Sequence, residues 1–76
     1  MNSGTKVPGL ASARNRAGLT QVSLAAILGV HPITVTRWES GERTPSIDTV
    51  VRLAAALNTT VGALLGEAPA AQGGAA

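Results

Sequence analysis

The side chains with the clearest chemical use lie in the segment from Pro32 to Ser40. Arg37 carries a planar guanidinium whose fork of donors matches the two major-groove acceptors of guanine. Ile33 cannot form a hydrogen bond, but an outward-facing isoleucine can pack on the methyl group of thymine. Thr36 carries a hydroxyl that can bond to a base or to a phosphate. Together these residue types favour contact with the edges of DNA bases.

Each of these side chains also has a less specific explanation. Arg37 could hold a phosphate or contact only water, and Ile33 could be an incidental apolar residue on the surface. A threonine on an exposed helix often bonds to its own backbone. The DNA interpretation therefore depends on how the surrounding elements are built.

The amino-acid composition does not favour catalysis or metal binding. The chain has one histidine, no cysteine and four acidic residues, and these offer no nucleophile with a base and no metal cluster at a workable spacing. We therefore expect no enzyme activity, no catalytic residue, no metal and no cofactor. We interpret the single histidine, His31, as a helix cap or a neighbour of a phosphate.

The residues on either side of Gly29 are spaced so that two short helices can cross closely at a tight turn. Ala25 is small enough for a close crossing, Gly29 can turn at positive φ, and Val35 can pack back on the first helix. Apolar residues recur at helical spacing on both sides, so the two helices can share one core. Trp38 comes three residues after Val35 and should point into that core rather than stack on a base.

This ordered set resembles the phage-repressor-like helix-turn-helix family (Cro/repressor type, lambda-repressor-like). The resemblance extends from about Leu10 to Gly66, and its residues are Leu19-Thr20-Gln21, Leu24-Ala25, Leu28-Gly29-Val30, Val35, Arg37-Trp38-Glu39, Gly41 and Pro45-Ser46. It implies sequence-specific binding of double-stranded DNA by a transcriptional regulator of the repressor kind. The segment 32–40 would be the recognition helix and would lie in the major groove.

The resemblance also implies roles for individual residues. Those expected to face base edges are Pro32, Ile33, Thr36 and Arg37. Those expected near the DNA phosphates are Gln21, His31, Thr34 and Arg43. Arg14 and Glu39 match positions that form a partly buried ion pair in this family, so their expected role is structural.

Helical signals predict an all-α fold, a compact bundle of about five short helices with no strand. The expected helices cover residues 8–17, 21–28, 32–40, 47–57 and 61–65. Their expected N-terminal caps include Thr20, His31, Ser46 and Thr60. Turns with a left-handed residue are expected at Gly18, Gly29, Gly41 and Asn58.

A chain of 76 residues has room for one small domain, which we place at residues 7–66. Residues 1–6 are polar and lack periodicity, and residues 67–76 read EAPAAQGGAA, so we expect a disordered N-terminal arm and a disordered low-complexity tail. The first residues do not show the pattern of a signal peptide, and no apolar run approaches the length of about 20 residues that a spanning helix needs. We expect a cytoplasmic, nucleoid-associated protein without membrane contact.

Charged residues make up only 13% of the chain, and the net charge is +2. Attraction to phosphates should therefore be modest for one copy. We expect a homodimer on an operator whose half-sites lie about 34 Å apart, joined by the exposed faces of the fourth and fifth helices. The alternative is a protein-interaction module, such as an antitoxin or adaptor, that binds its partner through Val22 and Ile27. DNA binding should weaken with ionic strength, whereas an apolar protein contact should not.

Overall fold

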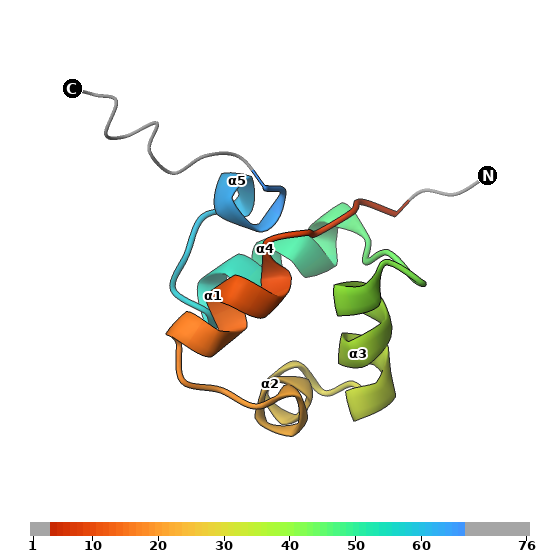
Figure 1. Ribbon diagram of the computed structural model, residues 1–76, viewed down its shortest axis with the longest axis vertical. Coiled ribbons are helices and arrows are strands. Elements are labelled where there is room, and N and C mark those ends of the chain that lie inside the picture. Colours follow the sequence, from red (N-terminus) through yellow and green to blue (C-terminus); the bar gives the residue numbers. More distant parts are fainter. Residues whose placement is uncertain (1–3, 67–76) are drawn as a thin grey trace.

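The computed structural model describes residues 4–66. This part of the chain consists of helices joined by turns and irregular segments and contains no strand. Five short helices pack together (Figure 1), which confirms the all-α fold. They are α1 Leu10–Arg16, α2 Gln21–Leu28, α3 Pro32–Ser40, α4 Ile47–Ala56 and α5 Val61–Leu64. Residues 1–3 of the expected arm and the whole expected tail, 67–76, lie outside the described residues.

The start of α1 was predicted wrongly. We expected the helix to begin near Pro8, but it begins at Leu10. The chain turns through Pro8 and Gly9, where the backbone N–H of Leu10 donates to the carbonyl oxygen of Val7 at 3.0 Å. Gly9 is the N-cap residue of α1, and its backbone N–H donates to the carbonyl oxygen of Leu64 at 2.9 Å, which links the helix start to α5. The other helices match the expected bounds to within about one residue at each end.

The predicted caps are present at four helix starts. Thr20, Ser46 and Thr60 each accept a hydrogen bond through the side-chain oxygen from the backbone N–H three residues later. His31 accepts at Nδ1 from the backbone N–H of Ile33, with 3.2 Å between the two nitrogens. Gly29 closes α2 with a φ of 74°, and this left-handed residue turns the chain into α3.

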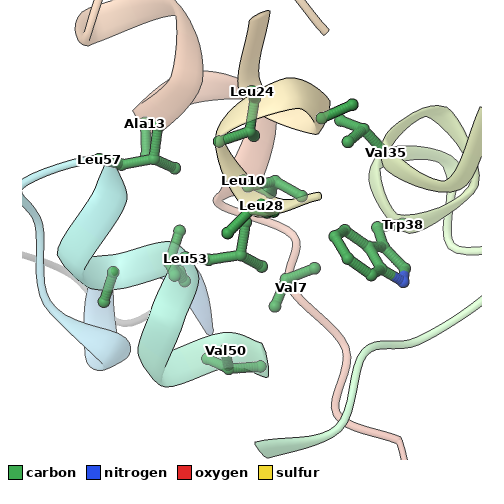
Figure 2. Packing of buried hydrophobic residues seen from close by; sticks show 13 residues of the cluster. Val7, Leu10, Ala13, Leu24, Leu28, Val35, Trp38, Val50, Leu53 and Leu57 are labelled. Carbon is green, nitrogen blue, oxygen red and sulfur yellow. The ribbon is translucent and has the colours of Figure 1, made fainter. Parts of the chain in front are cut away.

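The core lies between α1, α2 and α4, and α3 contacts it from one side (Figure 2). Leu10, Leu24 and Leu53 are fully buried at its centre. Val35 and Trp38 attach α3 to this core, at 0% and 8% exposure, so the prediction of an inward-facing Trp38 is confirmed.

The chain before α1 covers one edge of this core. Val7 is 3% exposed and lies beside the Trp38 ring (Figure 2). Thr5, within the segment expected to form the arm, donates its backbone N–H to the carbonyl oxygen of Pro45 at 2.8 Å. This segment therefore links α1 to the loop between α3 and α4. Within residues 4–66, no helix has the length and apolar character needed to cross a bilayer.

Candidate nucleic-acid interface

Helix α3 has one buried face and one face open to solvent. Val35 and Trp38 lie on the buried face. Ile33 is 44% exposed, the Arg37 side chain is 42% exposed, and Thr36 is also exposed. Residues 33, 36 and 37 are three and four positions apart, so their side chains project from the same side of the helix. This geometry leaves three of the four expected base-contacting residues open to a ligand.

The first turn of α3 presents a mixed surface. Pro32 is half-buried and has no polar side-chain atom, so it can offer a base only an apolar contact. Because His31 accepts at Nδ1, its ring N–H is the one on Nε2. That N–H is a donor of the kind a phosphate oxygen accepts. Thr34 is half-buried beside them and donates its backbone N–H to the carbonyl oxygen of His31 at 2.9 Å.

The structure brings Arg14 and Glu39 together as a bidentate ion pair. Arg14 Nε donates to Glu39 Oε2 at 2.6 Å, and Nη2 donates to Oε1 at 3.3 Å. The two side chains are only 13% and 9% exposed. The hydrogen bond to Glu39 raises the pKa of Arg14 above its usual value, with a further contribution from the opposite charge, although burial acts in the other direction. Arg14 Nη1 also donates to the carbonyl oxygen of Leu19 at 2.8 Å, so this pair joins α1, α3 and the loop before α2.

Gln21 occupies the first turn of α2 and bridges the ion pair to the exposed face of α3. Its Nε2 donates to Glu39 Oε1 at 2.9 Å. Its Oε1 accepts from the hydroxyl of Thr36 at 2.9 Å. Arg14, Glu39, Gln21 and Thr36 therefore form one chain of hydrogen bonds, which we call the α3 network. The Arg14–Glu39 pair was predicted, and so was a role for Gln21 and for Thr36. The two bonds that join Gln21 to Glu39 and to Thr36 were not predicted, because they connect residues far apart in the sequence.

The basic residues at the end of α3 are open to solvent. Arg37 Nε lies 3.7 Å from Glu42 Oε2, and the Glu42 side chain is 65% exposed, so this ion pair is long and should contribute little. Arg43 is exposed in the following loop, and its side chain has no ion-pair or hydrogen-bond partner among residues 4–66. Its backbone N–H donates to the carbonyl oxygen of Arg37 at 3.1 Å. Both guanidinium groups are thus available to an anion or a base.

Among the described residues, no three His, Cys, Asp or Glu side chains gather closely enough to hold a metal ion. The side chains that gather on and beside α3 are hydrogen-bond donors, hydrogen-bond acceptors and apolar groups. Such a surface is suited to binding.

Comparison with known proteins agrees with this arrangement. The helix-turn-helix family matches residues 10–64, from the start of α1 to the end of α5. Two crystal structures of HppE are similar, each with a TM-score of 0.67. HppE with Fe(II) and the alternative substrate (S)-1-HPP is 30% identical over 84% of this chain and 34% of that chain. Apo-HppE is 33% identical over 92% of this chain and 38% of that chain.

This chain therefore spans about a third of the length of those HppE chains. A comparison with curated proteins gave no match. The family match covers more than half of the chain, and the turn at Gly29, the buried face of α3 and the Arg14–Glu39 pair all lie within it. The chain belongs to the helix-turn-helix family of the Cro/repressor type, which is lambda-repressor-like, and this membership supports a DNA-binding regulator.

Proposed function

We propose that this domain binds a specific double-stranded DNA sequence as a transcriptional repressor, with α3 in the major groove. The observation that supports this most strongly is the division of α3 into two faces. Val35 and Trp38 hold the helix on the core, while Ile33, Thr36 and Arg37 remain open to solvent. A helix held in this way can enter a groove about 12 Å wide without rearrangement of the core.

Arg37 is the first residue to test, because its fork can donate to both O6 and N7 of guanine. Arg37→Ala should remove a guanine preference at one position of the site, which corresponds to about 1–3 kcal/mol of discrimination. The measurement is selection of binders from a random duplex library with each protein. Arg37→Lys retains the charge but lacks the fork, so it should keep more of the overall affinity and still lose the preference. If Arg37→Ala selects the same sequences as the original chain, Arg37 has no part in base recognition.

Arg43 should act through the phosphates and not through the bases. Arg43→Ala should weaken binding to all duplexes by a similar factor and reduce the slope of log affinity against log salt by about 1. Titration of one labelled duplex at several salt concentrations measures this slope. Arg16→Ala is the matched control, since Arg16 is exposed and is the last residue of α1. This end of α1 lies away from α3 (Figure 1). A change of base preference on Arg43→Ala would contradict the assignment.

We propose that two copies bind one operator as a homodimer. On α4, Ile47 and Val51 are 51% and 53% exposed and lie one turn apart, which offers an apolar patch for a second copy. A pseudo-palindromic site with half-sites about 34 Å apart is then expected. Protection of the selected duplex from cleavage measures this spacing, and the mass of the complex gives the number of copies. Such a regulator would act on DNA in the cytoplasm, in association with the nucleoid.

A protein-interaction module is the second candidate function, and one observation favours it. Val22 and Ile27, on α2, are 63% and 54% exposed, and α2 is apolar on its outer side as well as its inner side. An antitoxin or adaptor would place a protein partner here. Val22→Glu with Ile27→Lys would abolish that contact and leave DNA affinity unchanged.

The similarity to HppE covers about a third of those chains, and we propose that this domain has no enzyme activity.

A further inference from the structure

We propose that Thr36 contacts only bases that present an amino group in the major groove, adenine or cytosine. The reason is that the α3 network fixes the direction of its hydrogen bonds. This inference rests on the proposed binding of DNA and adds the chemical preference of one position. A threonine hydroxyl can ordinarily donate or accept, so it distinguishes bases poorly. Here its neighbours remove that freedom.

The first step is the orientation of the Gln21 amide. Arg14 carries only donors, and the Glu39 carboxylate that it holds carries only acceptors. Glu39 Oε1 lies 2.9 Å from the amide of Gln21, so the group facing it must be the Nε2 donor. The partner thereby determines the orientation of the amide.

The second step is the direction of the bond between Gln21 and Thr36. With Nε2 turned to Glu39, the carbonyl oxygen Oε1 of Gln21 faces the Thr36 hydroxyl at 2.9 Å. A carbonyl oxygen can only accept, so the hydroxyl must donate its proton. The other neighbour of the hydroxyl is the carbonyl oxygen of Pro32 at 3.4 Å, which also only accepts. The single proton of Thr36 is therefore committed within the protein.

The third step concerns what remains for DNA. Thr36 is exposed on the same side of α3 as Ile33 and Arg37, and its oxygen can offer only a lone pair outward. In the major groove, the donors are the N6 amino group of adenine and the N4 amino group of cytosine. Guanine N7 and O6 and thymine O4 are acceptors, so they would meet an oxygen without a proton. Arg14 and Glu39, which need not touch DNA, act as positioning residues for this choice.

The test uses the full chain and a random duplex library, with Thr36→Val as the variant that keeps the shape and removes the hydroxyl. Thr36→Val should lose a preference for adenine or cytosine at one position. On the selected duplex, purine in place of that adenine, or 2-pyrimidinone in place of that cytosine, lacks the amino group. The original chain should lose about fivefold in affinity for this duplex, and Thr36→Val should lose nothing further.

Thr34→Val is the matched control, because it removes the same atoms from the same helix. It should lower the affinity for both duplexes by the same factor. If the position altered by Thr36→Val prefers guanine or thymine, or if Thr36→Val alters no position, the inference is wrong. If the folded original chain binds no duplex from the library, the proposed function is wrong, and the inference fails with it.

Glu39→Gln tests the positioning role separately. The amide introduced at position 39 can turn its carbonyl to Arg14 and donate to Gln21, whose own amide then reverses and donates to Thr36. Thr36 would then accept from Gln21, and only the long 3.4 Å contact to the carbonyl oxygen of Pro32 would compete with a base for its proton. Guanine and thymine should therefore become accepted at this position. A purely structural role for Glu39 would lower the melting temperature and leave the preference intact. Retention of the adenine or cytosine preference by folded Glu39→Gln would therefore contradict the inference.

Discussion

Replacement of Arg14 by methionine should destabilise the domain by about 3–5 kcal/mol, because it leaves the Glu39 carboxylate buried without its cation. The Glu39 side chain is only 9% exposed, so water cannot replace the lost partner. The carbonyl oxygen of Leu19 would also lose its donor. Small domains have about 5–15 kcal/mol of stability in total, so a large part of the free energy of unfolding should be lost. Urea denaturation followed by helical circular dichroism measures the difference.

The double variant Arg14→Met with Glu39→Leu distinguishes the net contribution of the ion pair to stability from the free-energy cost of leaving the Glu39 carboxylate buried without a cation. Replacing both partners by apolar residues should restore much of the stability, since a buried pair often contributes little against an apolar pair of similar size. If the double variant is less stable than Arg14→Met, the carboxylate is stabilised by other groups and the explanation is wrong. Gln21 also donates to Glu39. Because the double variant removes this acceptor, we expect it to remain somewhat less stable than the original chain.

Arg14 should not make stability depend on pH in the ordinary range. Its pKa is raised in the folded state, so its contribution is fully present below the pKa of an unfolded arginine. That contribution is lost only as the pH rises through the raised value. Both values lie in strongly alkaline solution, far from conditions in which the domain would bind DNA.

Trp38→Ala should cost about 3–5 kcal/mol of stability, which is the usual effect of removing a large aromatic side chain from a core. Trp38 is 8% exposed, and its ring lies beside Val7 (Figure 2). Its loss would open a cavity between α3 and the segment before α1. Denaturation measures the free energy, and hydrogen exchange at the backbone N–H of Thr5 reports whether that segment is still attached to Pro45.

Trp38→Phe is the conservative control for this site. It retains an aromatic ring in contact with Val7 and should cost less than the alanine variant. If Trp38→Ala lowers the free energy of unfolding by less than about 1 kcal/mol, then Val35 and the α3 network hold α3 on the core without the tryptophan. The proposed binding of DNA requires α3 in a fixed orientation, so the affinity of both variants for the selected duplex should also be measured under conditions in which they are folded.

Most of the fold could be predicted from local signals. The bounds of α2 and α3 agree with prediction because each is marked by residues within one turn of its ends. Thr20 and His31 cap the helix starts, and Gly29 and Gly41 close the helix ends with positive φ. The start of α1 could not be predicted in this way. The chain turns just before Leu10, and the N-cap residue Gly9 bonds to Leu64, a contact between residues from opposite ends of the domain.

The exposed side of α3 was likewise determined by the sequence, since helical periodicity alone places Val35 and Trp38 opposite Ile33 and Arg37. Only the tertiary structure decided how Thr36 can bond. Its hydroxyl is directed by Gln21, 15 positions earlier, and Gln21 is directed by Glu39, 18 positions later. Periodicity specifies the side of a helix on which a residue lies. The direction of a hydrogen bond depends on which donors and acceptors other helices bring within about 3 Å, and that requires the packed structure.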